Sequence, residues 1–348
     1  MSLPKAFQLL RFTTYVAPRR LISATACTYG IKSRWQMPYR VTLKNRMKEM
    51  EKKGLLPTNA RSDFIEWNYD SEIYAFGKRL HEEFDESLLR QALIDPSYIT
   101  RETLRQQELG VEVPALQMSG NSELSTEGKD IIFDYATKFV RATHRVLPEE
   151  GVSALVDYLT SEELLSEIGH GIGLKDLILT EEYPPSQVTV VNAFQSVVAV
   201  LNRSSGLSRC HIFVKDFVLT QLVGKNIYDI WKIEDPVSIL SNILLQNGRE
   251  AFEPRLVFQS GKNTIQAVYQ VAVYCEKQFM GTGMKWYGET VNAAVEQAAW
   301  DALSRLFQTT EAVSPIPFEK PEQLNLNDNK NMPIDNWSID RASNIVMC

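Results

Sequence analysis

Hydrophobic positions recur at intervals of three and four residues through much of the first two thirds of the chain. The segments IYAFGKRLHEEF (73–84) and ESLLRQAL (86–93) show this period, and Asp95-Pro96 ends the second. Residues at this spacing share one face of an α-helix, and the residue before a proline disfavours helical geometry. Strand-like alternation is nearly absent over residues 67–235, so we expect a mostly α-helical block there.

From about residue 236 the hydrophobic period changes. DPVSILSNILLQNG predicts a helix that starts at Pro236 and stops at Asn247-Gly248. Three following segments alternate as strands do: PRLVFQSG, AVYQVAVYCEKQ and QFMGTGMKW. The Ala-rich ETVNAAVEQAAWDALSRLF predicts a final helix. Residues 236–308 are therefore expected to form an α-β-β-β-α domain of the α+β class.

Both ends of the chain differ in composition from its body. The first 48 residues contain ten Lys or Arg and no acid, whereas the other 300 contain 27 basic and 43 acidic side chains. The leader MSLPKAFQLLRFTTYVAPRRLISATA is rich in Ser, Thr and Ala and lacks the compact apolar core of a secretory signal. This composition is typical of a mitochondrial transit peptide, and a disordered basic arm is the alternative interpretation. Residues 309–348 are polar and dotted with prolines, which predicts a disordered tail.

Several classes of protein are disfavoured by the sequence. The four cysteines form no Cys-x-x-Cys pair and share no ligand spacing with the four histidines, so we expect no disulfide framework and no metal site. The run VTVVNAFQSVVAVL (188–201) is shorter and more interrupted than the ~20 apolar residues that span a bilayer, so it predicts a buried helix and no membrane span. GHGIG (169–173) lacks the full Gly-x-Gly-x-x-Gly spacing and follows a helix, so we interpret it as a loop that binds no cofactor.

Three motifs in the helical block, taken in order, resemble those of ribonuclease III. LLRQALIDPSY (88–98) is similar to that family's leucine-rich opening motif, NSELSTEG (121–128) to its acidic signature, and LLSEIGHGIGLKDLIL (164–179) to its later helix and turn. The resemblance implies a ribonuclease III-like helical domain over residues 67–235. It also implies that residues 236–308 form a domain of the double-stranded RNA-binding type.

The metal ligands implied by this resemblance are missing from the chain. Carried across one residue at a time, the carboxylates of the signature fall on Ser122, Ser125 and Lys129. The later pair on a second helix falls on Asn192 and Gln195. Cutting a phosphodiester with Mg²⁺ needs several carboxylates that converge on the ion. We therefore predict a catalytically degenerate domain without catalytic residues, metal or cofactor.

Four acids remain in this stretch, and their spacing places them elsewhere. On a helix with 100° per residue, Glu123, Glu127, Asp130 and Asp134 form one stripe about 130° from the face that carries Ser125. A charge run of this kind is usually a solvated helix face. We predict that these acids do not replace the missing ligands.

The charge of the predicted RNA-binding domain is balanced. Residues 236–308 contain six basic and six acidic side chains, and the start of the last helix, ETVNAAVE, has two glutamates and no lysine. A neutral domain is poorly suited to generic duplex binding. The candidate RNA-binding residues come mainly from the basic arm, with two lysines from the domain: Arg34, Trp35, Arg40, Lys44, Arg46, Lys48, Lys262 and Lys285.

A closer resemblance is to ribosomal proteins of the mitochondrial large subunit that descend from the nuclease family. Four segments carry it: WNYDSEIYAFGKRL (67–80), SSGLSRCHIFVKDFVLTQLVGK (204–225), DIWKI (229–233) and YCEKQF (274–279). The resemblance implies a structural constituent that binds mitochondrial rRNA and neighbouring large-subunit proteins. An active mitochondrial ribonuclease acting on double-stranded RNA and a free RNA-binding assembly factor are the alternatives. Dimerisation stays open.

The predicted organisation has five parts. They are a transit peptide over residues 1–30, a basic arm and connector over 31–66, the degenerate nuclease-like domain over 67–235, the RNA-binding-like domain over 236–308, and a polar tail over 309–348.

Overall fold

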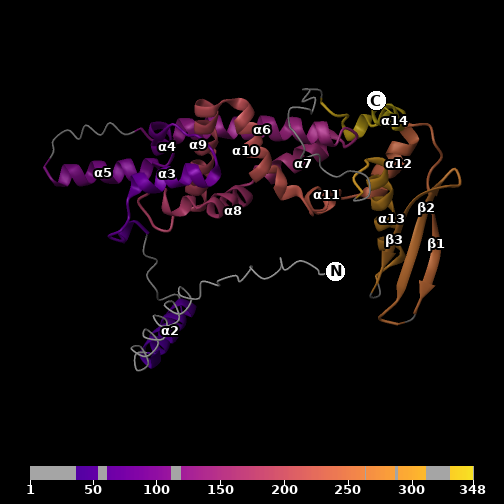
Figure 1. The fold of residues 1–348 in the computed structure, drawn as a ribbon. Coiled ribbons are helices and arrows are strands. Elements are labelled where there is room, and N and C mark those ends of the chain that lie inside the picture. The colour runs from indigo at the N-terminus through magenta and orange to yellow at the C-terminus, as the bar shows by residue number, and fades with distance from the viewer. Residues whose placement is uncertain are drawn as a thin grey trace, which may run out of the picture. The chain divides into compact units, whose positions relative to one another are not determined.

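The computed structural model describes residues 37–53, 61–110, 119–262, 264–286, 289–310 and 330–347 (Figure 1). The chain divides into two units, Met1–Asn59 and Ala60–Cys348. In the first unit, helix α2 (Met37–Lys52) exposes four basic candidates, Arg40, Lys44, Arg46 and Lys48. The predicted transit peptide, together with Arg34 and Trp35, lies outside the described residues.

The first part of the second unit is helical, as the hydrophobic period predicts. Its helices are α3 (Tyr69–Leu80), α4 (Glu86–Ala92), α5 (Pro96–Glu108), α6 (Ser122–Thr143), α7 (Glu149–Leu159), α8 (Glu162–Ile172), α9 (Gln187–Ser205), α10 (Leu207–Phe217) and α11 (Ile227–Ile230) (Figure 1). Helix α9 is central, with an almost continuous run of buried residues from Val190 to Leu201. The prediction of a buried helix over 188–201 is confirmed. This core holds α6 and α9 in a fixed register.

Glycines let two helices approach α9 closely. A Cβ atom at Gly128 of α6 would lie 1.8 Å from the carbonyl oxygen of Gln195, and one at Gly169 of α8 would lie 2.6 Å from Val190 Cγ1. The prediction of a loop over residues 169–173 is wrong, because α8 continues to Ile172. Of these five residues, only Gly173 takes a positive φ, which is 86°. Gly169 is needed for helix packing and not for a turn, which sequence spacing does not distinguish.

The second part has the predicted α-β-β-β-α order. Helix α12 (Pro236–Gln246) precedes strands β1 (Glu253–Ser260), β2 (Val268–Cys275) and β3 (Gln278–Lys285), and helix α13 (Val291–Leu306) follows them (Figure 1). The strands form an antiparallel sheet in the order β1-β2-β3. Helix α13 packs on one face of this sheet, where a Cβ at Gly281 would lie 2.5 Å from the backbone nitrogen of Ala302. The mostly helical block followed by an α+β domain confirms the predicted fold class.

The predicted disordered tail is wrong for residues 330–347. These residues include helix α14 (Ile339–Met347), and the Trp337 side chain is 1% exposed. Trp337 Nε1 donates a hydrogen bond to the carbonyl of Val146 at 2.9 Å, and its ring meets Phe307 edge-on at 5.2 Å. The polar composition therefore hides several apolar contacts, of which Trp337 is the largest and the most buried.

Candidate functional site

The structure brings three of the predicted site residues together between α6 and α9. Ser125 Oγ lies 2.9 Å from Gln195 Oε1 and 3.3 Å from Asn192 Oδ1. Ser125 and Gln195 are each 7% exposed, so this contact is largely shielded from water. The Ser125 hydroxyl can donate its proton to either amide oxygen, and none of the three groups brings a negative charge.

The other two predicted site residues lie at the edge of this contact. Ser122 and Lys129 precede and follow Ser125 on α6 by three and four residues, and both are exposed. Residues at these spacings share a helix face. The site face of α6 therefore presents a hydroxyl and an ammonium to solvent above a buried amide cluster.

The acidic stripe of α6 is occupied by ion pairs. Glu127 Oε2 accepts from Arg203 Nε at 2.9 Å, and Glu123 lies 3.7 Å from the same guanidinium. Asp134 pairs with Lys138 at 2.9 Å, one helical turn away. Exposed pairs of this kind stabilise a protein by roughly 0–1 kcal/mol, so they are mainly a solvated surface. The sequence did not indicate Arg203, because it lies on a different helix.

Among the residues that the structure describes, no group of three His, Cys, Asp or Glu side chains is placed to hold a metal ion. Cys210 and Cys275 are both buried and free. Burial raises the pKa of the Cys210 thiol to about 12, so this cysteine stays protonated at neutral pH. Neither thiol is therefore arranged as a nucleophile or a metal ligand.

Asn121 holds the frame of the site. Its side chain is 1% exposed, and Nδ2 donates to the carbonyl of Ala92 at the end of α4 at 3.2 Å. Its own carbonyl accepts from Ser196 Oγ of α9 at 3.2 Å. Asn121 therefore connects three helices at the start of α6, which is a structural role.

The two RNA-binding candidates of the second part differ in their surroundings. Lys262 is exposed after the end of β1. Lys285, at the end of β3, pairs with Glu289 at 3.1 Å. The charge next to the start of α13 is thus partly neutralised, in keeping with the balanced composition of this part.

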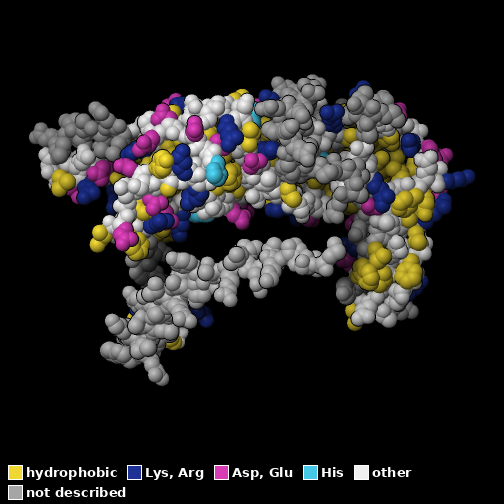
Figure 2. Space-filling view, in the orientation of Figure 1, with side chains coloured by type: hydrophobic (Ala, Val, Ile, Leu, Met, Phe, Trp, Pro, Cys, Tyr) yellow, Lys and Arg dark blue, Asp and Glu magenta, His cyan; other side chains and the backbone are white. Residues whose placement is uncertain are grey.

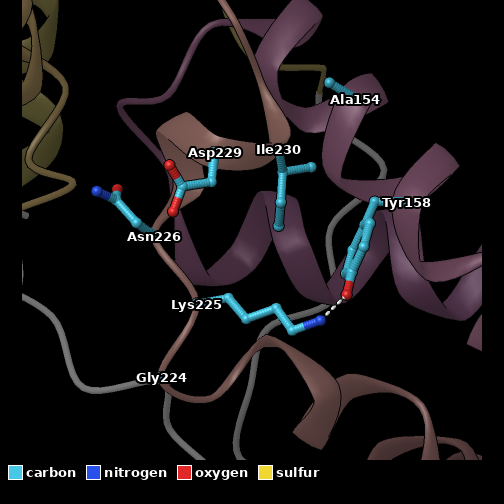
Figure 3. A pocket seen from close by; sticks show the side chains of 7 residues that line it. All are labelled: Ala154, Tyr158, Gly224, Lys225, Asn226, Asp229 and Ile230. Atoms are coloured by element: carbon cyan, nitrogen blue, oxygen red, sulfur yellow. Dashed lines mark hydrogen bonds between the residues drawn. The ribbon is translucent and has the colours of Figure 1, made fainter.

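A pocket of about 640 Å³ lies between α7 and α11 (Figure 3). The ammonium of Lys225 donates to the hydroxyl of Tyr158 and lies 4.8 Å from the centre of that ring (Figure 3). Asn226 and Asp229 line another side of the pocket (Figure 3). No sequence motif indicated this pocket, because Tyr158 and Lys225 are 67 residues apart.

In the part of the chain that the structure describes, we find no helix with the length and apolar character that crossing a bilayer requires.

Comparisons with known proteins match both parts of the second unit. Residues 68–201 match the family model described as large ribosomal subunit protein mL44, endonuclease domain. Residues 231–338 match the model described as MRPL44 dsRNA-binding domain, and this range includes Trp337. The large ribosomal subunit protein mL44 of Caenorhabditis elegans is 30% identical over 308 residues, which are 85% of this chain and 75% of that protein.

Two solved structures have lower similarity. The nuclease domain of ribonuclease III from Campylobacter jejuni is 16% identical, with a TM-score of 0.36 over 44% of this chain and 99% of that chain. Dicer from Pichia stipitis is 14% identical, with a TM-score of 0.29 over 53% of this chain and 88% of that chain.

Proposed function

The chain belongs to the mL44 family of large ribosomal subunit proteins, and from this membership we propose that it is a structural constituent of the mitochondrial large subunit. The acid-free, Arg-bearing leader supports import into the mitochondrion, and the protein acts in the matrix as part of the ribosome. Its partners are mitochondrial rRNA and neighbouring large-subunit proteins.

The observation that carries the proposal is the polar contact between α6 and α9. Ser125, Asn192 and Gln195 stand where the resemblance to ribonuclease III places carboxylates, and the Ser125 hydroxyl lies within hydrogen-bond distance of the side-chain oxygens of both amides. Proteins usually hold the Mg²⁺ that activates water and stabilises a departing oxygen through one or more carboxylates. A site built from a neutral hydroxyl and neutral amides offers no negative charge to a divalent cation, and the ammonium of Lys129 at its edge repels one. The domain is therefore a scaffold and not an enzyme.

In this proposal, helix α2 makes the main contact with the rRNA. Arg40, Lys44, Arg46 and Lys48 are exposed within three turns of this helix, and Arg34 and Trp35 precede it in the sequence. Clustered cations bind phosphates with an affinity that falls as salt rises, by roughly 0.7–0.9 in log–log slope for each contact. Lys262 and Lys285 add local contacts in the second part.

We expect the protein to sediment with the large subunit when mitochondrial lysate is fractionated in moderate salt. Replacing the four α2 cations by glutamine should release it at lower salt and flatten the salt dependence of its association. The matched control replaces four exposed cations elsewhere: Lys78, Arg101, Arg105 and Arg145. A wild-type protein that stays off the large subunit would instead support a free assembly factor.

The alternative of an active nuclease makes an opposite prediction. Purified protein incubated with double-stranded RNA and Mg²⁺ should leave the RNA intact, because no carboxylate lies in the Ser125 cluster. Cleavage that disappears in Glu127→Gln would overturn the proposal. Because Glu127 pairs with Arg203, we expect the Glu127→Gln protein to leave the RNA as intact as the wild-type protein does.

A further inference from the structure

The sheet of the second part has one face that α13 does not cover. Val271 and Val273 of β2 are buried, and they pair with Gly283 and Gly281, the two glycines that lie against the backbone of α13. Because side chains alternate along a strand, Tyr274 points to the opposite face, which we call the open face. On β1, Arg255 pairs with Ala272 and therefore lies on the open face too. Figure 2 shows hydrophobic side chains gathered over this sheet.

Two β-bulges bring phenylalanines to the open face. Leu256 pairs with Val271 on the covered face, and simple alternation would place Phe258 beside it. A register shift between Leu256 and Phe258 pairs Phe258 with Gln270 instead, which turns it to the open face. Bulges often re-aim a side chain next to a functional site.

A second β-bulge has the same effect on β3. Gly281 pairs with Val273 on the covered face, so Phe279 would also point towards α13 by alternation. The second register shift pairs Phe279 with Tyr274 and turns it to the open face. Phe258 is 52% exposed and Phe279 is 47% exposed. Both rings are therefore presented to solvent on the open face.

Aromatic and guanidinium groups alternate across one end of this face. The Arg255 guanidinium lies 5.0 Å from the centre of the Tyr274 ring, and the Tyr274 and Phe279 rings are 5.9 Å apart. Arg305, which reaches over from α13, lies 5.2 Å from the Phe279 ring. Phe258 lies further along the face, because its partner Gln270 is four residues from Tyr274, or roughly 13 Å at 3.3 Å per residue.

Carboxylates fix these guanidinium groups and offset their charge. Arg255 pairs with Glu253 at 2.7 Å, and Arg305 pairs with Asp301 at 3.1 Å. The open face therefore offers planar groups with little net positive charge. This combination suits stacking on bases more than it suits attraction of a phosphate backbone.

We propose that the open face binds unpaired RNA by stacking bases on Phe258, Phe279 and Tyr274, with Arg255 as a further planar partner. Bases in a duplex are stacked on one another, so the ligand is a single-stranded rRNA segment. The inference rests on the proposed function for its rRNA ligand. A protein partner is the competing occupant of the same face. It would bind through hydrophobic contact with the rings and would not need their flat faces for stacking.

The test measures fluorescence anisotropy of a labelled, short unstructured RNA titrated with the purified full-length protein in which Arg40, Lys44, Arg46 and Lys48 of α2 are glutamine, so that α2 does not bind the RNA. Replacing Phe258 and Phe279 by leucine keeps an apolar surface and removes the planes. We expect this pair of substitutions to weaken binding about tenfold or more for each ring, as for other stacked bases. Tyrosine at both positions should preserve binding. The salt dependence should be shallow, near that of one or two phosphate contacts at about −0.7 each.

Leu245→Ala is the matched control, because Leu245 is 63% exposed on α12 and should leave the affinity unchanged. Equal affinity of the α2-glutamine proteins with phenylalanine and with leucine at positions 258 and 279 would overturn the inference. The inference would also be overturned if an RNA duplex of equal length bound as tightly as the unstructured RNA and lost the same affinity on the leucine substitutions. If alanine at both positions weakens association with the large subunit and leucine does not, the face docks a protein. The anisotropy assay uses purified protein and tests only the open face. The proposed function is tested separately, by sedimentation with the large subunit.

Discussion

Trp337→Ala should lower the free energy of unfolding by roughly 3–5 kcal/mol, the range for truncating a buried large aromatic. The substitution removes a side chain that is 1% exposed and leaves a cavity against Phe307. It also removes the donor to the carbonyl of Val146, which then stays buried without this partner. Urea unfolding followed by circular dichroism measures the change.

Trp286, an exposed tryptophan directly after β3, gives the control. Trp286 is 55% exposed, so Trp286→Ala should change the free energy of unfolding by about 0.5 kcal/mol or less, as for most surface sites. Equal losses in the two variants would show that Trp337 is not the anchor of the C-terminal segment. Hydrogen exchange in α14 should rise in Trp337→Ala, because helix α14 loses the contact that holds it.

Several polar contacts support this anchor. Asn331 Nδ2 donates to the carbonyls of His144 and Leu147, at 2.8 Å and 2.9 Å. The backbone nitrogen of Ile339 donates to Asn247 Oδ1 at 2.9 Å. The segment thus connects the end of α6 with the end of α12. Sequence composition could not predict this, because it averages one tryptophan over many polar residues.

The helical block was predictable because its apolar residues keep one period over long stretches. Helix α9 is the clearest case, since a run of apolar residues such as that from Val197 to Leu201 has one stable environment, the core. The contact of Ser125 with Asn192 and Gln195 followed from the resemblance and not from periodicity. These residues lie on helices whose crossing no local pattern encodes.

The residues on the open face of the sheet could not be predicted from the alternation of side chains along each strand. Alternation places Phe258 with Leu256 and Phe279 with Gly281, and both placements are reversed by one extra residue in the strand. A bulge leaves little trace in composition, since the inserted residue belongs to the same residue types as its neighbours. The RNA-binding candidates of the sequence therefore did not include these rings.

Glycine at position 128 is required by the closest approach of α6 to α9. A Cβ atom there would lie 1.8 Å from the carbonyl oxygen of Gln195 and 2.6 Å from its carbonyl carbon. Both neighbours are backbone atoms of a buried helix, so they cannot move aside as a flexible side chain would. The two helices must separate, which disturbs the packing of Leu124 and breaks the contact of Ser125 with Gln195.

Gly128→Ala should therefore destabilise the protein by about 3 kcal/mol or more, at or beyond the upper end of the usual overpacking range. The gain in helix propensity, about 1 kcal/mol, does not offset this loss. Gly171→Ala is the matched control, because Gly171 lies in α8 and a Cβ there would meet nothing within 4 Å. Urea unfolding should place Gly171→Ala at or above the wild-type stability. A Gly128→Ala protein as stable as Gly171→Ala would contradict the close crossing of α6 and α9, and with it the geometry of the polar site between them.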